Sequence, residues 1–385
     1  MDYQQENNVW VIGHKNPDTD SICAAICYAN LKNRLQDGFH YIPKRAGSIN
    51  EETKYVLQHF GVEPPEYAED AGAQVKDIAF RRTAGVSGHI SLKKAWELMK
   101  TENVMTLAVT SASDKLEGLI ITGDIAESYM DVYDNHILSR ARTQYKNIVE
   151  TLNGTLLAGN EHAYFLRGKV VVATGSRDVI EECIESDDLV IVGDRDETHI
   201  CALEENASCM VVTGGTQVSA QVLEMANRRD CVVIITPYDT FTAARLINQS
   251  MPIKYFMKKE NFVTFDIDDY VDEVREVMSK KRHRDFPVLD DQRRYLGMVS
   301  RRNLLNMHKK KLILVDHNEK SQAIDGIEGA EILEIIDHHR LGSLETMSPV
   351  FFRNQPLGCT ATIIYQMYQE QGVEIPKNIA GIMMA

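Results

Sequence analysis

Residues 13–21 read Gly-His-Lys-Asn-Pro-Asp-Thr-Asp-Ser. The apolar run Val9–Ile12 precedes them and predicts a buried strand. From residue 22 to residue 35 apolar side chains recur at helical spacing, with Asp20 or Ser21 as the expected N-cap. One imidazole and two carboxylates therefore leave the carboxyl end of a strand on a tight loop. Open α/β sheets bind their ligands at that edge, so we expect a ligand site here.

Two later segments repeat this arrangement. Residues 311–315 lead into Asp316-His317-Asn318, and residues 331–336 lead into Asp337-His338-His339. Carboxylates and imidazoles together suit manganese, cobalt and zinc. A single cluster of this kind is a weak signal, because strands often end in a solvated Asp and most histidines only make a local hydrogen bond. Three clusters at equivalent strand ends supply ligands for two cations that share a bridging carboxylate.

The three motifs resemble those of the DHH phosphoesterases. They are His14-x-x-x-Asp18-x-Asp20, Asp316-His317-Asn318 and Asp337-His338-His339. The longer strings HKNPDTDS, from residue 14, and DHHRLG, from residue 337, resemble the family II inorganic pyrophosphatases within that superfamily. The resemblance covers residues 1–65 and 311–385 and implies an α/β fold, in which a DHH-type parallel sheet domain is interrupted by an inserted region. The two ends of that insertion must then lie close together.

The inserted region contains an internal repeat. Each of Met99, Val109 and Gly118 recurs 179 residues later (278−99, 288−109, 297−118). Each copy predicts an amphipathic helix, two strands and a second helix. Units of about 55 residues bury too little surface alone, so we expect the copies to pack together. The repeat resembles a pair of CBS domains, which implies adenine-nucleotide binding. The expected first helices are 92–99 and 271–278, and the expected strands are 106–109, 116–121, 285–289 and 295–300.

The CBS resemblance implies nucleotide ligands near the last strand of each copy, where that family carries Gly-x-x-Thr/Ser-x-x-Asp. The first copy keeps the acid, Asp124, but has Ile121 at the hydroxyl position. The second keeps the hydroxyl, Ser300, and offers Asn303 in place of the acid. Amides hydrogen-bond ribose and arginines bind phosphate, so we predict binding mainly against the second copy. The alternative is a structural pair with solvated arginines. The arginines concerned are Arg282, Arg284, Arg301 and Arg302.

Residues 139–250 alternate apolar strands with helical stretches, which predicts a small parallel α/β domain. The run Val211–Thr216 resembles the signature turn of a DRTGG domain. By itself its Gly-Gly pair indicates a tight turn or, alternatively, a phosphate cradle. The order CBS, DRTGG, CBS within a DHH frame resembles the CBS-containing family II pyrophosphatases. The predicted boundaries are 1–65 and 311–385 for the DHH domain, 66–138 and 251–310 for the CBS domains, and 139–250 for the DRTGG domain.

The composition narrows the class of protein. The net charge of the 385 residues is −14, which argues against nucleic acid as a partner. The polar start and the lack of any apolar run of about 18 residues predict neither a secretion signal nor a membrane partner. The seven cysteines are odd in number and form no CxxC pair, so we expect reduced core residues. Together these features predict a cytoplasmic protein.

The family resemblance also implies roles for the motif residues. It implies hydrolysis of inorganic pyrophosphate with two Mn²⁺ or Co²⁺ ions, Mg²⁺ bound with the substrate, regulation by AMP, ADP or ATP, and a homodimer formed through the CBS pair. His14 and Asp18 would hold one metal, Asp20 and His338 the other, and Asp316 would bridge them. His339 would donate a hydrogen bond or proton to the phosphate, and Asp337 would orient a histidine.

The chain ends in the apolar run 378–385. The resemblance implies a further metal-binding Asp and a C-terminal lobe beyond this point, so we expect that lobe to be absent and activity to be reduced. Two other functions stay open. One is a DHH phosphodiesterase that cleaves cyclic dinucleotides or short oligonucleotides, although such relatives commonly have Gly where Thr19 stands. The other is a non-catalytic adenine-nucleotide sensor with the DHH part as scaffold.

Overall fold

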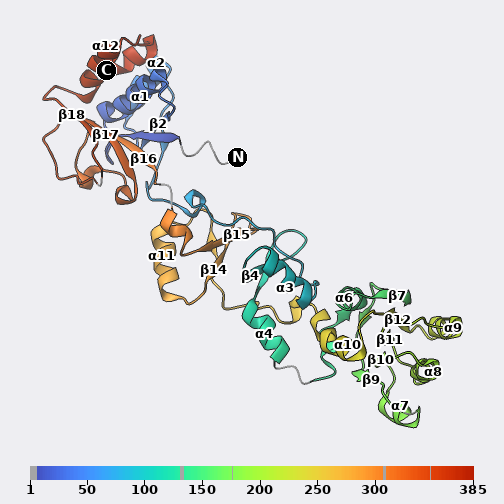
Figure 1. Ribbon diagram of the computed structural model, residues 1–385. Coiled ribbons are helices and arrows are strands. Elements are labelled where there is room, and N and C mark those ends of the chain that lie inside the picture. The colour runs from blue at the N-terminus through green and yellow to red at the C-terminus, as the bar shows by residue number, and fades with distance from the viewer. Residues whose placement is uncertain (1–6, 131–133, 176, 307–308, 347) are drawn as a thin grey trace. The chain divides into compact units, whose positions relative to one another are not determined.

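The computed structural model describes residues 7–130, 134–175, 177–306, 309–346 and 348–385 (Figure 1). The chain divides into two compact units. Unit 1 comprises Met1–Phe80, Phe265–Arg284 and Ser300–Ala385, and unit 2 comprises Arg81–Thr264 and Asp285–Val299. Within the described ranges no helix is both long and apolar enough to cross a membrane.

Unit 1 is built on a six-stranded sheet with the order β18-β17-β16-β1-β2-β3, in which every pairing is parallel. The first strand pairs with one that lies about 300 residues later, with Val9 opposite Lys311 and Ile12 opposite Leu314. The two ends of the chain therefore build one sheet, as expected for an interrupted sheet domain, although the strands on either side of the insertion, β3 and β16, are separated by β1 and β2. The strands are β1 (Asn8–Ile12), β2 (His40–Arg45), β3 (Glu66–Tyr67), β16 (Lys311–Val315), β17 (Glu331–Asp337) and β18 (Phe351–Asn354).

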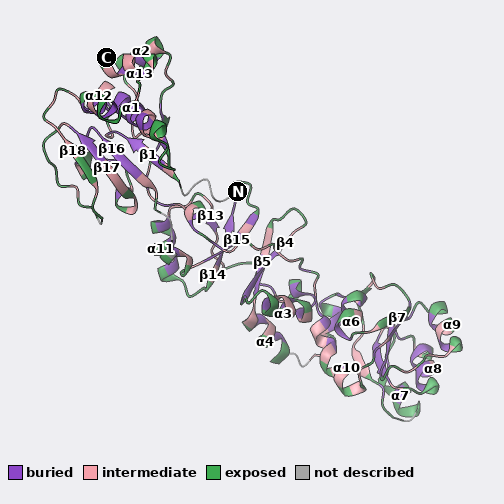
Figure 2. Cartoon of the chain, turned by 45° about the horizontal axis from the view of Figure 1, so that its top comes forward, coloured by how far each residue is buried: buried purple, intermediate pink, exposed green. Residues whose placement is uncertain are grey.

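Both faces of this sheet are covered, which explains why its inner strands are almost entirely apolar. Val9 and Val11 point into a core formed with the helices. Ile12 and Leu314 point to the other face and pack with Ile324 in a second core. Figures 1 and 2 show the helices of residues 19–35, 51–60 and 360–371 together on one face and the inner strands buried. The helices of this unit are α1 (Thr19–Leu35), α2 (Glu51–Phe60), α11 (Val271–Lys280), α12 (Thr360–Gln371) and α13 (Lys377–Met384).

The first helix begins earlier than expected. Its N-cap is Asp18, whose carboxylate accepts a hydrogen bond of 2.9 Å from the N–H of Ser21. The expectation that Asp20 or Ser21 caps the helix is therefore wrong. Asp18 has the extended backbone that an N-cap needs, with φ −89° and ψ −171°. This start places Asp20 inside the first turn.

Unit 2 contains the predicted α/β domain, as a five-stranded sheet with the order β7-β12-β11-β10-β9. Three of its pairings are parallel, as expected, but β7 lies antiparallel to β12. The strands are β7 (Thr155–Ala158), β9 (Val170–Val172), β10 (Leu189–Val192), β11 (Cys209–Val212) and β12 (Val232–Ile235), beside the short pair β6 (Thr143–Gln144) and β8 (Tyr164–Phe165). The helices are α5 (Ile137–Arg140), α6 (Tyr145–Thr151), α7 (Arg177–Cys183), α8 (Asp196–Glu204), α9 (Ala220–Arg228) and α10 (Thr240–Leu246).

The two copies of the repeat pack against each other within unit 2. Thr106 donates a 3.0 Å hydrogen bond to Asp285, and these residues occupy equivalent positions, 179 apart. Arg81, from the first copy, pairs with Met298, while Leu119 of the first copy pairs with Lys258. Backbone hydrogen bonds therefore join the two copies at two places. The expected packing of the copies is confirmed. The elements are α3 (Leu92–Thr101), β4 (Thr106–Thr110), β5 (Leu116–Ile121), α4 (Thr122–Met130), β14 (Asp285–Leu289) and β15 (Tyr295–Ser300), with β13 (Phe265–Asp266) in unit 1.

Two details differ from the expectations. After β15 the described residues form a short 3-10 turn, Asn303–Asn306, where a helix was expected. The seven cysteines are free, as predicted, but Cys183 is exposed and Cys359 is only half-buried, so these two are not core residues.

Candidate metal centre

The strands of the unit 1 sheet run in one direction, so their carboxyl ends meet at one edge. His14 follows β1 after one glycine, and Asp18 and Asp20 lie at the start of α1. Asp316 directly follows β16, and Asp337 is the last residue of β17. Since β16 lies between β1 and β17, all three predicted clusters reach the same part of the edge.

Asp316 lies at the centre of the site. Its Oδ2 is 3.4 Å from Nε2 of His14, and its Oδ1 is 3.3 Å from Nε2 of His338 and 3.8 Å from Nδ1 of His339. Asp18 lies 3.9 Å from the same nitrogen of His14. Ligand atoms lie within 4.8 Å of one another in two groups, and Asp316 belongs to both. The groups are His14, Asp18 and Asp316, and Asp316, His338 and His339.

Asp20 lies beside the second group. Its Oδ2 is 3.8 Å from Nε2 of His338. Its two oxygens accept hydrogen bonds of 2.7 Å and 3.0 Å from the N–H groups of Thr360 and Ala361, at the start of α12. The Thr360 hydroxyl donates a 3.0 Å hydrogen bond to Asp316. The sequence analysis missed Thr360, although a helix that begins just after Gly358 has free N–H groups that favour a carboxylate.

Hydrogen bonds orient the histidines of the DHH motif. Asp337 accepts from Nδ1 of His339 at 2.9 Å and from the backbone N–H groups of both histidines. Asn318 donates to the other oxygen of Asp337. Nδ1 of His338 lies 3.0 Å from the carbonyl of Leu357, which leaves Nε2 facing Asp316 with its lone pair. Fixing a ring through its far nitrogen is typical of metal-binding histidines.

The donor set fits a pair of divalent first-row cations. The side chain of Asp316 is 1% exposed, and among the described residues its Oδ2 has no hydrogen-bond partner. Asp316 also adopts a left-handed backbone with φ +62°, which is costly for a residue with a Cβ. The carboxylate of Asp316 is buried, lies between two imidazoles and has an unpaired oxygen. It is therefore well placed to bridge two cations. Nε2 of His317 is also buried without a hydrogen-bond partner in the described part of the chain.

The charges of the site depend on one another. Burial, with the negative charge of Asp316 as the next cause, raises the pKa of Asp20 to about 6. Burial alone would raise the pKa of Asp316 too, but its interactions with His14 and the Thr360 hydroxyl outweigh burial and lower it. The same contact with Asp316 raises the pKa of His14. Without a cation the cluster therefore holds protons on His14 and Asp20 more tightly than isolated side chains do, which is the expected cost of placing acids together.

Comparison with known proteins identifies the family. The DRTGG domain model matches residues 147–250 and the CBS domain model matches residues 253–309. The chain is 41% identical over 375 residues to the cobalt-dependent inorganic pyrophosphatase of Clostridium perfringens, covering 97% of this chain and 68% of that one. The chain belongs to the family II inorganic pyrophosphatases that carry CBS and DRTGG domains. The predicted family, fold class and domain types are thereby confirmed.

Two further relatives agree. The probable manganese-dependent inorganic pyrophosphatase of Thermotoga maritima is 38% identical over 377 residues, covering 98% of this chain and 68% of that one. A crystal structure of the CBS and DRTGG domains of the regulatory region of the Clostridium perfringens pyrophosphatase, complexed with the activator diadenosine tetraphosphate, is 36% identical. It matches with a TM-score of 0.57 and covers 60% of this chain and all of that one. The metals and the class of regulator named for these relatives are the ones that the sequence analysis expected.

In this family II pyrophosphatase the predicted nucleotide residues make local hydrogen bonds. Ser300 donates through N–H and hydroxyl to the side-chain oxygen of Asn303, at 2.8 Å and 2.7 Å, and Asn303 donates to the carbonyl of Ala79. The guanidinium of Arg301 donates to the carbonyls of Met278, Lys281 and His283, near the end of α11. Arg284 is exposed. These four residues belong to unit 1, whereas Asp124 belongs to unit 2, where it accepts from the N–H of Ile121 and lies 3.2 Å from Lys258.

The Gly-Gly loop of the pyrophosphatase's DRTGG domain is a closed turn. Gly214 and Gly215 both have positive φ, 77° and 65°. Their N–H groups donate to the carbonyls of Tyr238 and Thr236 at 2.7 Å and 2.8 Å. Since a phosphate cradle needs free N–H groups, the tight-turn interpretation describes this loop.

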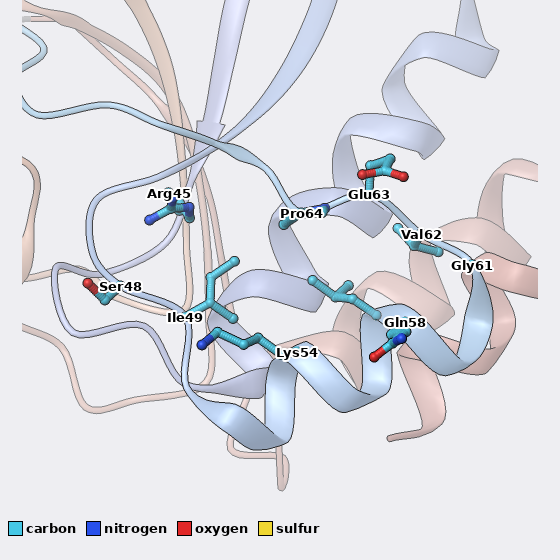
Figure 3. Close-up of a pocket in the computed structure, with 10 residues that line it drawn as sticks. Arg45, Ser48, Ile49, Lys54, Gln58, Gly61, Val62, Glu63 and Pro64 are labelled. Carbon is cyan, nitrogen blue, oxygen red and sulfur yellow. The ribbon is translucent and has the colours of Figure 1, made fainter.

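A cavity of about 700 Å³ lies beside α2 of the pyrophosphatase, apart from the candidate metal ligands (Figure 3). Its cations are already engaged: Arg45 donates to the carbonyls of Pro65 and Gly47, and Lys54 donates to Glu51. None of the lining residues is a predicted site residue. They are Arg45, Ser48, Ile49, Lys54, Leu57, Gln58, Gly61, Val62, Glu63 and Pro64.

Proposed function

We propose that this chain hydrolyses inorganic pyrophosphate to two phosphates at a pair of Mn²⁺ or Co²⁺ ions. His14 and Asp18 hold one ion, Asp20 and His338 hold the other, and Asp316 bridges them. The observation that carries this proposal is the position of Asp316, whose buried carboxylate contacts imidazoles from two different strand ends. When bound, two such cations lower the pKa of a shared water and neutralise the charge of the substrate, which enters with Mg²⁺.

The protein's own groups prepare the site for an anionic substrate. Asp337 accepts a hydrogen bond from Nδ1 of His339, so Nε2 is the ring nitrogen that is left to face a phosphate oxygen. The His339 side chain is half exposed, whereas Asp337 is fully buried. We therefore assign His339 as the donor to a phosphate oxygen and Asp337 as the residue that orients it. The N–H groups of Thr360 and Ala361 hold the carboxylate of Asp20 in place.

Phosphate release tests the function, and metal binding tests the site. The purified chain should bind Mn²⁺ or Co²⁺ and release phosphate from pyrophosphate, and His338→Asn should weaken both. His162→Asn is the matched control, because His162 is an exposed imidazole in unit 2. Cleavage of dinucleotides without cleavage of pyrophosphate would identify a phosphodiesterase instead. Nucleotide binding without any metal binding would identify a sensor.

Metal binding is measured separately from turnover because the chain spans 68% of the length of the Clostridium perfringens and Thermotoga maritima relatives. A chain that binds two metals with the expected ligands but turns over slowly supports the assignment of the metal site. Slow turnover in such a chain would then point to the residues that bind the substrate.

We also propose that AMP, ADP or ATP regulates the chain through the CBS repeats, with Ser300, Asn303, Arg284, Arg301 and Asp124 as nucleotide ligands. The support is the hydrogen-bonded Ser300–Asn303 pair, which occupies the positions that the CBS pattern gives to phosphate and ribose ligands. Replacing both residues with alanine should abolish the nucleotide response and spare metal binding. An unchanged response would place the nucleotide elsewhere.

The remaining proposals concern organisation and setting. We propose the domain boundaries 1–65, 66–138, 139–250, 251–310 and 311–385, a homodimer formed through the CBS pair, and a cytoplasmic location without nucleic-acid or membrane partners. Light scattering of the full chain, compared with a chain that lacks residues 66–310, measures whether the CBS region is required for dimerisation.

A further inference from the structure

One short segment, residues 322–326, contacts the loop that carries His14 and Asp18. The backbone N–H of Lys15 donates a 2.8 Å hydrogen bond to the carbonyl of Gln322. The ammonium group of Lys15 lies 2.5 Å from the carboxylate of Asp325. Lys15 is the immediate neighbour of His14, so both contacts act on the backbone that directs the His14 imidazole towards Asp316.

Asp325 is in turn held by the segment through which the chain leaves the sheet. The N–H of Ala71 donates a 2.7 Å hydrogen bond to the carbonyl of Asp325, and Asp70 forms a parallel backbone bridge with it. The next residue, Gly326, has φ +72°, and a Cβ there would lie 1.9 Å from the carboxylate of Asp70. Only glycine fits this approach without displacement. The contact between residues 70–72 and 325–326 is therefore close and specific.

Residues 70–73 also contact the segment through which the chain returns to the sheet. The ammonium group of Lys310 donates a 2.7 Å hydrogen bond to the carbonyl of Gly72, and Lys310 directly precedes β16, which leads to Asp316. The N–H of Val271, at the start of α11, donates to the carbonyl of Ala73 at 2.9 Å. One segment thus touches the second copy of the repeat, the start of β16 and the partner of Lys15.

We infer that Lys15 and Asp325 are positioning residues, which hold the His14 loop in its metal-binding conformation and couple it to the position of residues 70–72. This inference rests on the proposed metal site. The pair does not contact Asp316 or the other candidate ligands, so it acts through His14. The ammonium group of Lys15 faces an acid of its own chain, which agrees with a positioning role.

The exposure of the pair makes the inference testable. The Lys15 side chain is 36% exposed and that of Asp325 is 68% exposed. Exposed ion pairs contribute little to stability, so removing this one should leave the fold intact while releasing the loop. A loss of metal affinity without a loss of thermal stability is therefore the signature of positioning. A general structural role would change both.

The experiment compares Asp325→Asn with Glu328→Gln in the full chain. Glu328 pairs with Lys320 across the two ends of that segment, and no contact among the described residues joins this pair to the His14 loop, which makes Glu328 a matched control. Mn²⁺ affinity is measured by calorimetry, and the visible absorption of bound Co²⁺ reports the geometry at the ligands. Asp325→Asn should lower the Mn²⁺ affinity by about 10- to 100-fold, the range typical of residues that orient metal ligands, and should alter the Co²⁺ spectrum. Glu328→Gln should do neither.

A double-mutant cycle separates this pair from two independent effects. If Lys15 and Asp325 act through each other, Lys15→Gln combined with Asp325→Asn should bind Mn²⁺ no more weakly than the weaker single variant. The charge-conserving variants Lys15→Arg and Asp325→Glu should restore most of the affinity. Additive losses, or loss of thermal stability in step with affinity, would overturn the inference.

Diadenosine tetraphosphate supplies the test of coupling. If residues 70–72 transmit a change in the repeat region to the loop, the nucleotide should shift the Mn²⁺ affinity of the parent chain and of Glu328→Gln, but not that of Asp325→Asn. An equal shift in all three would overturn the coupling. A parent chain that binds no Mn²⁺ would instead refute the proposed function, whereas equal Mn²⁺ affinity in both variants would refute only the inference made here.

Discussion

The parallel six-stranded sheet and the mostly parallel five-stranded sheet of this chain both end in polar loops, but the polar groups of those loops are satisfied in different ways. At the carboxyl edge of the five-stranded sheet, the hydroxyl of Thr213 bonds to the carbonyl of Val192 and to Thr240, and the N–H groups of the two following glycines bond to backbone carbonyls. At the carboxyl edge of the six-stranded sheet, Asp316 and His317 keep buried atoms without a hydrogen-bond partner among the described residues. The loop after β11 thus satisfies its own polar groups, whereas the loop after β16 leaves buried polar atoms unpaired among the described residues.

The difference lies in which groups the strands deliver. Hydroxyls, carbonyls and N–H groups satisfy one another, so a loop made from them needs nothing else. Carboxylates repel one another, and burial, with the negative charge of Asp316 as the next cause, raises the pKa of Asp20 to about 6. A divalent cation removes that repulsion. The edge of the six-stranded sheet is a candidate metal site because its loops supply more hydrogen-bond acceptors than donors. The parallel sheet fold by itself does not create such a site.

The strongest test of this contrast is Asp316→Asn, compared with Asp188→Asn in the other sheet. Removing the shared carboxylate should lower the Mn²⁺ affinity by at least about 100-fold, because replacing residues that merely orient metal ligands already costs up to that much. Asp188 is equally buried but accepts hydrogen bonds from the N–H groups of Lys169 and Glu185, so its replacement should leave the affinity unchanged. Calorimetric titration measures both variants. Equal losses would erase the distinction between the two sheets.

Metal addition should next stabilise one sheet and not the other. At a free Mn²⁺ concentration 100 times the dissociation constant, the linkage of binding to folding contributes about 2.7 kcal/mol. Hydrogen exchange followed by mass spectrometry should show this added protection in peptides from β1 and β16 and none in those from β10 and β11. Similar protection in both sheets would mean that the cation does not act through the proposed edge.

A smaller effect is expected at the edge of the five-stranded sheet. Thr213→Val keeps the shape of the side chain but removes the hydrogen bonds of 2.9 Å to Val192 and Thr240, which should cost about 1 kcal/mol of stability. Thr216→Val is the milder control, since Thr216 is only half-buried and makes one bond of 3.2 Å. Chemical denaturation monitored in unit 2 gives the free energies. A change of Mn²⁺ affinity in either variant would contradict the view that this edge binds no metal.

The smallest effect is expected for Asp37, a carboxylate of unit 1 that accepts hydrogen bonds and lies near a lysine. Partial burial opposes the ionisation of Asp37, but hydrogen bonds from the Tyr41 hydroxyl and the Phe39 N–H, with the charge of Lys32, outweigh burial and lower the pKa. A lowered pKa stabilises the fold above the unfolded value of 3.8, and this contribution is lost as the pH falls through the folded value. Asp37→Asn should therefore cost about 1 kcal/mol or less at pH 7, and progressively less below pH 4. Thermal melts of both proteins between pH 7 and pH 3 measure this cost. A cost that grows as the pH falls would contradict the prediction.

Much of the architecture could be predicted because it depends on local patterns. Apolar runs predicted β5, β14 and β15 to the residue, and the offset of 179 identified two copies whose equivalent residues Thr106 and Asp285 bond to each other. Acids and imidazoles after three such runs predicted that these side chains would meet at one sheet edge, where the structure brings them together. These signals succeed because strand formation and ligand type are properties of a few consecutive residues.

The errors and omissions share a physical cause, which is that they depend on contacts made by the folded chain. Asp18 caps α1 two residues before Asp20, and Asp20 then receives the N–H groups of Thr360 and Ala361, about 340 residues away. The short 3-10 turn after β15 and the exposure of Cys183 likewise carry no local signal. The pattern of residues along the chain does not show which distant residue will contact a given side chain in the folded protein.

The amino-acid sequence by itself determined which groups this protein brings to chemistry and the kind of element that carries each one, because side-chain type and hydrophobic period are encoded locally. The tertiary structure alone decided that Asp316, with its left-handed backbone, lies between His14 and His338, and that Lys15 faces Asp325. The reason is that β1 must pair with β16 across about 300 intervening residues before any of these distances exist.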